Sequence, residues 1–219
     1  MTQTSASLYS RLRRWLAPLA LLAAAALQPA VAQQQPQFQA INPPIATDSG
    51  SKIEVIEFFS YGCPHCADFN PLIHAWASRL GPDVAFKKVP ITFGRPAWTN
   101  VAKLYYALET TGDLAKLDEA VFKAIHEQRV NLFDPRTAEE WVGKQGADGK
   151  KFAEAFASFG VNSKMSRAEQ IARAYKVDGV PMVVVDGRYV VKGEAFKDVL
   201  RNTDLLIEKI RAERAGKKK

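Results

Sequence analysis

The sequence predicts an α/β sheet domain that is interrupted by an all-helical insertion. Two observations carry this prediction. β-rich apolar segments lie before residue 92 and after residue 181, and between them, over residues 96–163, the apolar residues change to helical spacing. The chain has 219 residues, of which 47% are apolar and 24% charged. It is therefore long and apolar enough to bury a core, which excludes a disordered protein.

The first 32 residues have the pattern of a secretory signal peptide. Arginines precede an apolar run at 15–27, and the small-residue sequence Ala30-Val31-Ala32 follows it. An uncleaved membrane anchor is the alternative, but this run is shorter than the roughly 20 residues that a membrane span needs. We expect cleavage after Ala32 and a mature protein that works outside the cytoplasm, where disulfides persist.

The first half of the sheet domain is assigned to residues 52–95. Residues 33–51, rich in Gln, Pro, Ser and Gly, are expected to form a flexible lead-in to it. A nearly continuous apolar run at 52–60 predicts a central strand buried on both faces. Apolar residues at helical spacing then predict a helix over 64–80, and a second strand is expected over 84–91.

Residues 96–163 are the predicted helical insertion. Within it, Gly112 follows an apolar helical stripe and predicts the end of a helix. The sequence from Thr137 to Glu140 has the form of a capping box, which predicts the start of a later helix. A further helix, over about 164–175, leads back to the sheet domain.

The second half of the sheet domain is assigned to residues 164–214. Two Val-rich runs flank Asp186-Gly187, which predicts a β-hairpin with a type I′ turn, and a C-terminal helix follows. A basic tail at 215–219 is expected to be solvated. The net charge is +7, but no basic stripe is interleaved with aromatic residues, so no nucleic-acid partner is expected.

The two cysteines form the motif Cys63-Pro64-His65-Cys66, at the first turn of the helix that follows the central strand. Unpaired N–H groups and a partial positive charge at a helix N-terminus stabilise a thiolate. Pro64 suits this first turn, and His65 can add a donor or a positive charge. A stabilised thiolate leaves readily, so the motif predicts an oxidising disulfide, with Cys63 exposed and attacked and Cys66 buried and resolving.

Three other uses of the cysteines are less consistent with the sequence. An inert bridge that closes so short a loop would stabilise the fold only weakly. Haem attachment requires a His directly after the second cysteine, where Ala67 stands. Two thiolates cannot complete a zinc site, and His74 lies too far along the helix to join Cys63. No metal or cofactor is therefore expected, and His74 and His126 are interpreted as ordinary helix residues.

Glu57 lies inside the buried run, six residues before Cys63. A carboxylate there is costly unless it is neutral or has a role. Burial should raise the pKa of Glu57, which suits it to pass a proton to or from Cys66. The alternative is that the end of the strand is exposed and Glu57 reaches solvent.

The dipeptide Val180-Pro181 stands at the start of a predicted strand, where a proline is unusual unless the peptide bond or the pairing is special. We expect a cis bond there. Such a bond would expose the backbone of Val180 for β-type pairing with an extended peptide.

These motifs together resemble a known family. The segment 57–66, EFFSYGCPHC, closely resembles the active-site segment of the DsbA family of bacterial periplasmic thiol:disulfide oxidoreductases. The later Gly179-Val180-Pro181 resembles the cis-proline loop of that family. A helical block between two halves of a thioredoxin-like domain matches the family's architecture as well. The resemblance covers essentially the whole mature chain.

The resemblance implies a thioredoxin-like fold with a helical insertion and a monomeric, cofactor-free dithiol oxidase in the periplasm. Cys63 would form mixed disulfides with newly exported proteins that carry free cysteines, and Cys66 would resolve them on the return path. His65 would stabilise the reduced thiolate, Val180 and Pro181 would contact substrate, and the buried glutamate would fill the family's acid position. A quinone-linked inner-membrane partner of the DsbB type would reoxidise the pair.

Gly62 departs from the family pattern, because some members carry a bulky aromatic residue there. The sequence therefore does not predict the shape of the substrate groove. Two rival functions also stay open. One is a reductase or isomerase on the same fold, although reductants more often carry Gly-Pro between the cysteines. The other is a non-catalytic binding or metal-handling module on the thioredoxin scaffold, which would keep its binding when Cys63 is replaced by Ser.

Overall fold

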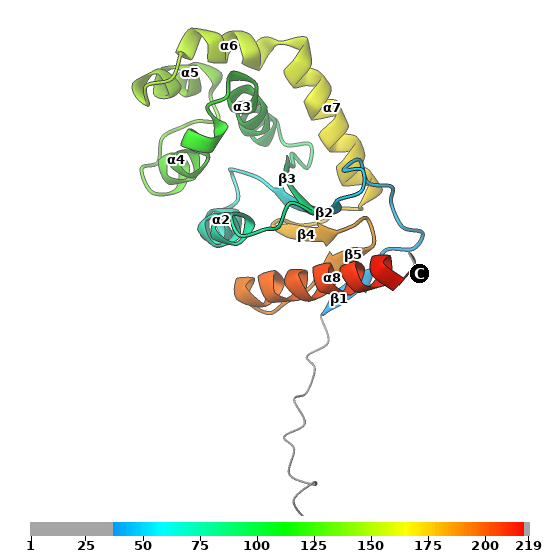
Figure 1. Ribbon diagram of the computed structural model, residues 1–219. Coiled ribbons are helices and arrows are strands. Elements are labelled where there is room, and N and C mark those ends of the chain that lie inside the picture. Colours follow the sequence, from blue (N-terminus) through cyan, green and yellow to red (C-terminus); the bar gives the residue numbers. More distant parts are fainter. Residues whose placement is uncertain (1–36, 217–219) are drawn as a thin grey trace, which may run out of the picture. The chain divides into compact units, whose positions relative to one another are not determined.

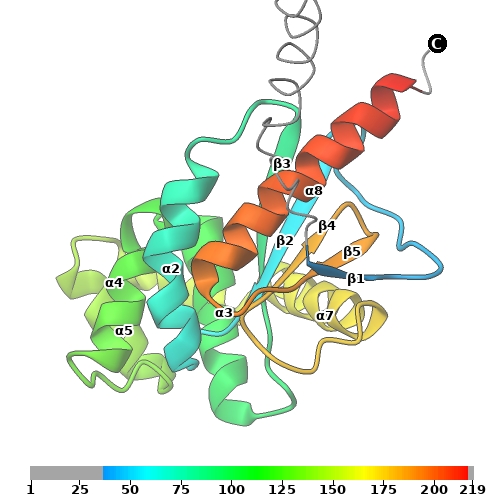
Figure 2. The same cartoon turned by 90° about the horizontal axis from the view of Figure 1, so that it is seen from below.

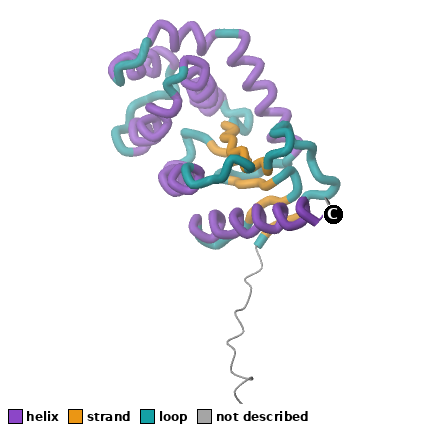
Figure 3. Tube along the Cα trace, in the orientation of Figure 1, coloured by secondary structure: helices purple, strands orange, loops and turns teal. Residues whose placement is uncertain are grey.

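A computed structural model describes residues 37–216, which contain a single mixed sheet surrounded by helices (Figures 1 and 3). The signal peptide and cleavage site expected at 1–32 lie outside the described residues, and so do the last three residues of the basic tail. The five strands occur in the spatial order β1-β5-β4-β2-β3. Their bounds are β1 (Phe38–Ala40), β2 (Ile53–Phe59), β3 (Val84–Pro90), β4 (Met182–Val185) and β5 (Tyr189–Val191).

The sheet combines one parallel pair with three antiparallel pairs. β2 and β3 run parallel, while β2–β4, β4–β5 and β5–β1 are antiparallel. The predicted hairpin is confirmed: Asp186 and Gly187, between β4 and β5, have φ values of 53° and 66°, as a type I′ turn requires. β2 is buried along its whole length, as the apolar run predicted.

Helices cover both faces of the sheet. In Figure 1, α8 lies below the sheet and the helices from α3 to α7 lie above it, and Figure 2 shows α2 and α8 together on one side. This arrangement confirms an α/β fold with a helical insertion. The helices are α2 (Pro64–Ala77), α3 (Pro96–Thr111), α4 (Leu114–His126), α5 (Pro135–Lys144), α6 (Gly149–Ala157), α7 (Phe159–Ala174) and α8 (Phe196–Gly216).

Alternate side chains of β2 enter two separate hydrophobic cores. Val55 packs in the core beneath α2 and α8, with Trp76 and Leu206, whereas Ile56 and Phe58 belong to the larger core that the insertion completes. This period-2 alternation places Glu57 on the same face as Val55, toward α2. None of the helices among residues 37–216 is long and apolar enough to span a bilayer.

Three expectations need correction. Part of the lead-in at 33–51 is a strand: β1 pairs with β5, and Phe38 packs edge-on against Tyr189. The domain boundary expected at residue 163 falls inside the continuous helix α7, and α8 extends into the expected basic tail as far as Gly216.

The capping box expected at Thr137 is also wrong. α5 begins at Pro135, and its N-cap is Asp134, whose carboxylate accepts the backbone N–H of Thr137 at 2.9 Å. By contrast, the predicted stop at Gly112 is confirmed, because Gly112 caps α3 in the left-handed conformation with φ 83°.

Candidate active site

The cysteine motif lies where β2 passes into α2. Cys63 is the N-cap residue in an extended conformation, and Pro64 occupies the first turn of the helix. The Cys63 sulfur makes no side-chain cap hydrogen bond, but it lies beside the unpaired N–H groups of the first turn, which favour its thiolate. Both cysteines are free thiols, and they differ in exposure: 7% of Cys63 is accessible to solvent and none of Cys66. The prediction that Cys63 is exposed is therefore wrong, because both cysteines are buried, but Cys66 is the more buried of the two, as expected.

The surroundings separate the acidities of the two thiols. A hydrogen bond with Cys66, supported by the backbone N–H groups of Cys66 and His65 and by the charge of His65, lowers the pKa of Cys63 to about 6. Burial, followed by the hydrogen bond with Cys63, raises the pKa of Cys66 far above its ordinary value. The surroundings therefore favour the thiolate form of Cys63 and the protonated form of Cys66.

The loop before β4 faces these thiols. The Val180–Pro181 bond is cis, as the sequence predicted, and the Cys63 thiol donates to the carbonyl of Val180 at 3.5 Å. Beside it lies a cavity of about 210 Å³. It is lined by His65, Phe69, Val180, Pro181, Val183, Gly193, Glu194, Ala195, Phe196 and Val199. The substrate-facing residues predicted from the sequence thus border one groove next to the motif.

Glu57 is fully buried, so the alternative in which it reaches solvent is wrong. Neither carboxyl oxygen has a hydrogen-bond partner, and the nearest cation, Lys88 Nζ, is 3.9 Å away. Burial raises the pKa of Glu57 to about 7, while the charge of Lys88 opposes this rise. Its negative charge in turn contributes to the raised pKa of Cys66. The two groups are electrostatically linked.

Two further buried charged residues, Lys88 and Asp118, lie near Glu57, and the sequence did not predict them. Lys88 on β3 donates to Asp118 on α4 at 2.8 Å and to Asn70 on α2 at 2.7 Å. Tyr61, in the turn before Cys63, donates its hydroxyl to the same aspartate. The only local signal was a charged residue at an otherwise apolar position of each element.

The two histidines lie in helices α2 and α4, as expected, but each makes a hydrogen bond that the sequence did not predict. Nε2 of His74 is 2.7 Å from Asp118 Oδ2, and Nε2 of His126 is 2.7 Å from the carbonyl of Tyr61. Both therefore contact the residues around the motif, although neither joins the sulfur of Cys63. Within residues 37–216, no group of three or more His, Cys, Asp or Glu side chains is arranged to hold a metal ion.

The space above Gly62 is occupied by aromatic side chains of the insertion. A Cβ atom added to Gly62 would lie 2.8 Å from Trp98 Nε1 and 3.1 Å from Phe133 Cε1. Phe93, which is exposed, lies next to Trp98 with 5.9 Å between ring centroids. A side chain at position 62 would therefore clash with Trp98, which lies at the start of α3.

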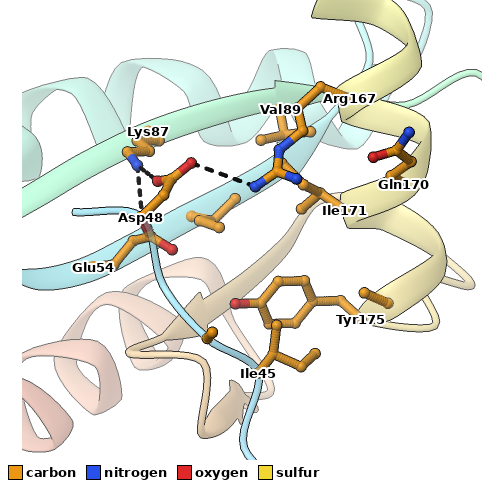
Figure 4. A pocket seen from close by; sticks show the side chains of 12 residues that line it. Ile45, Asp48, Glu54, Lys87, Val89, Arg167, Gln170, Ile171 and Tyr175 are labelled. Atoms are coloured by element: carbon orange, nitrogen blue, oxygen red, sulfur yellow. Dashed lines mark hydrogen bonds and ion pairs between the residues drawn. The ribbon is translucent and has the colours of Figure 1, made fainter. Parts of the chain in front are cut away.

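A second cavity, of about 400 Å³, lies between α7 and the outer half of β2 and β3 (Figure 4). Its polar side chains pair with one another: Lys87 with Asp48 and Glu54, and Arg167 with Asp48. None of the residues predicted for the active site lines this cavity. By contrast, the groove beside Val180 is lined by His65 of the cysteine motif.

Comparison with known proteins identifies the family. Residues 54–203 match the DSBA-like thioredoxin domain. The chain belongs to this family. A thiol:disulfide interchange protein DsbA of Bordetella parapertussis is 41% identical over 199 residues, which cover 89% of this chain and 94% of that protein. The protein of the same name from Pseudomonas aeruginosa is 35% identical over 179 residues, 80% of this chain and 84% of that one.

Solved DsbA structures have the same fold. The crystal structure of Pseudomonas aeruginosa DsbA superposes with a TM-score of 0.78 at 35% identity, and the match covers 84% of this chain and 95% of that one. DsbA from Xylella fastidiosa gives a TM-score of 0.75 at 34% identity, over 80% and 95% of the two chains. As a member of the DsbA family, the chain is a thiol:disulfide oxidoreductase.

Proposed function

We propose that the chain acts as an oxidase, which donates a Cys63–Cys66 disulfide to newly exported proteins with free cysteines. The observation that carries this proposal is the position of Cys63 at the N-terminus of α2, where hydrogen bonds lower the pKa of its thiol to about 6. A thiolate that is stable near neutral pH favours the reduced form of the pair. The disulfide is then the less stable form and passes readily to another protein.

The exchange proceeds in two steps. A substrate thiolate attacks Cys63, so that a bond forms between the substrate sulfur and Cys63 while the Cys63–Cys66 bond breaks. Cys66 leaves as a thiolate and takes up a proton, because its own pKa is strongly raised. A second substrate thiolate then attacks the first substrate sulfur, which oxidises the substrate and releases Cys63 as a thiolate.

Val180 and Pro181 border the groove that would receive an extended segment of the substrate next to Cys63. His65 lines the same groove, and its charge contributes to the lowered pKa of Cys63. Its proposed role is to stabilise the Cys63 thiolate, while Pro64 holds the first turn of α2.

The redox equilibrium tests the direction of transfer. The mature protein is equilibrated with defined ratios of reduced and oxidised glutathione, and the fraction with free thiols is measured. We expect the pair to stay reduced until the buffer is strongly oxidising. A pair that is already oxidised in a reducing buffer would contradict the oxidase and favour a reductase or an inert bridge.

Matched cysteine variants test the order of attack. With Cys66→Ser, a mixed disulfide between Cys63 and a reduced, unfolded substrate should accumulate, because the resolving thiol is absent. With Cys63→Ser it should not form, and oxidase activity should vanish. Binding of substrate by Cys63→Ser together with unchanged biological activity would instead indicate a non-catalytic binding module.

The proposal places the protein in the periplasm as a monomer, with cleavage after Ala32. A quinone-linked membrane protein of the DsbB type would reoxidise it. The support is the signal-peptide pattern of residues 1–32. Mass determination of the exported protein should give a chain that starts at Gln33, and light scattering should give the mass of one chain. Reoxidation should require membranes that contain quinone.

A further inference from the structure

Lys88, the buried cation of the redox centre, lies near two buried carboxyl groups, those of Asp118 and Glu57. Lys88 Nζ is 2.8 Å from Asp118 Oδ2 but 3.9 Å from Glu57 Oε2, so its close ion pair is with Asp118. All three side chains are at least nine-tenths buried. At such depth a charge without a partner is costly, so the carboxyl group that does not hold the cation favours its neutral form.

Asp118 has every contact that an ionised carboxylate needs. It accepts hydrogen bonds from Tyr61 and Lys88 and is paired with His74. Burial raises the pKa of Asp118, but the hydrogen bond with His74 and the charge of Lys88 outweigh this effect, so the pKa falls to about 2. Asp118 is therefore the permanent anion of the cluster.

Glu57 has no hydrogen bond to either oxygen, and its ion pair with Lys88 is long, at 3.9 Å. The charged or titratable groups that act on it come from every element around it. They are Lys88 on β3, Asp118 on α4, His74 and Cys66 on α2, Tyr61 in the turn before α2, and Tyr105 on α3. Lys88 is the nearest cation, but its shorter ion pair is with Asp118.

We propose that Asp118 is a positioning residue of the redox centre: by binding Lys88 at 2.8 Å, it keeps this cation 3.9 Å from Glu57, which can then keep a proton for Cys66. Asp118 lies on α4, so the helical insertion supplies the close anionic partner of Lys88, which belongs to the sheet domain. The inference rests on the proposed exchange reaction. When the Cys63–Cys66 bond breaks, the proton moves from the Glu57 carboxyl group to the Cys66 thiolate, and Glu57 becomes the anion next to Lys88.

The test is the pH dependence of disulfide reduction by glutathione, with the rate expressed per glutathione thiolate. In the natural protein this rate should fall as pH rises and Glu57 loses its proton. In Asp118→Asn the fall should begin at lower pH, because Lys88 is then free to pair with Glu57. A decrease of one unit in the pKa of Glu57 would lower the rate about fivefold near pH 7.

Glu119→Gln is the matched control, since this neighbour on α4 is exposed and pairs only with Lys123 on its own helix. Its pH profile should coincide with that of the natural protein. In a Glu57→Gln background, Asp118→Asn should no longer move the profile. If Asp118→Asn gives the profile of the control, or if it slows the reaction equally with and without Glu57, the proposal is wrong.

Lys88→Met keeps the proposal testable if Asp118→Asn does not fold. Loss of the cation should move the fall in rate to higher pH, the opposite direction, and a shift to lower pH would contradict the proposal. The reaction with glutathione depends on the chemistry of the cysteine pair and not on which proteins are its natural substrates. A failure of the oxidase proposal would therefore appear in the redox equilibrium and not in these profiles.

Discussion

At the scale of single residues, β2 carries two buried glutamates in different electrostatic surroundings. Glu54 is paired with Lys87 at 2.7 Å and accepts the hydroxyl of Ser49 at 2.6 Å. Glu57, three residues later, has no hydrogen bond. The first glutamate thus has a close cation and a hydrogen bond, whereas burial without such partners raises the pKa of the second.

This difference predicts opposite effects of the same substitution. Below about pH 4.5, Glu57 is protonated in both the folded and the unfolded chain. Between that pH and about 7 only the folded chain keeps the proton, so the free energy of unfolding falls as pH rises. Glu57→Gln should remove this loss, so its stability relative to the natural protein should be higher at pH 8 than at pH 4, by at most ~3 kcal/mol.

Glu54→Gln is the control on the same strand. It should lower the free energy of unfolding at pH 8, because the buried carboxylate partner of Lys87 is lost. Urea unfolding of both variants at the two pH values measures the effect. An identical pH dependence of stability for Glu57→Gln and the natural protein would show that Glu57 titrates as it does in the unfolded chain.

At the scale of elements, helix starts show how a local pattern can be overridden. Three aspartates precede helices of the insertion: Asp134 and Asp148 each accept a backbone N–H of the following turn, whereas Asp113 makes no side-chain cap to α4. Asp134 lies in an extended conformation with ψ 126°, and Asp113 lies in the helical region with ψ −7°. Only the extended backbone directs the carboxylate toward the free N–H groups of the following turn.

Asp134→Ala should therefore lower the free energy of unfolding by about 1 kcal/mol, because α5 loses its N-cap. Asp113→Ala should cost less, since no cap bond to α4 is lost. Denaturant unfolding of the two variants at neutral pH gives the comparison. Equal losses would mean that the cap geometry does not determine the stability of α5.

The sequence predicted the elements whose patterns are local. β2, the hairpin turn, the end of α3 at Gly112 and the cysteine motif all follow from residues within a few positions of one another. β1 was missed because three residues in a Gln- and Pro-rich segment carry no periodicity, and only their pairing with β5 makes them a strand. The Lys88–Asp118 pair was missed because it joins residues 30 positions apart, on elements that meet only in the folded chain.

At the scale of the whole described fold, the sheet ends in a short edge strand at the side away from β3. β1 covers the edge of β5, and the aromatic pair of Phe38 and Tyr189, with 4.7 Å between centroids, holds it there. The strand thus occupies the hydrogen-bonding edge of β5, which would otherwise be available for pairing with other chains.

Phe38→Ala should loosen this edge and lower the free energy of unfolding by roughly 1 kcal/mol, the order of an aromatic pair with its partly buried area. Gln39→Ala, at the next and exposed position of the strand, should stay within about 0.5 kcal/mol of the natural protein. Hydrogen exchange of the β5 amides should accelerate only in the first variant. Equal protection in both variants would mean that Phe38 does not hold the strand in place.

The unbroken helix α7 has a consequence for recombining this protein with its relatives. It begins among the insertion helices and ends next to the sheet. Because the helix is continuous, no loop separates the insertion from the sheet domain at this junction. Each residue added to or removed from an α-helix rotates everything beyond it by about 100° and moves it by about 1.5 Å. A chimera that exchanges insertions must therefore preserve the residue count of α7, because a shift of one position would rotate Asp118 out of line with Lys88.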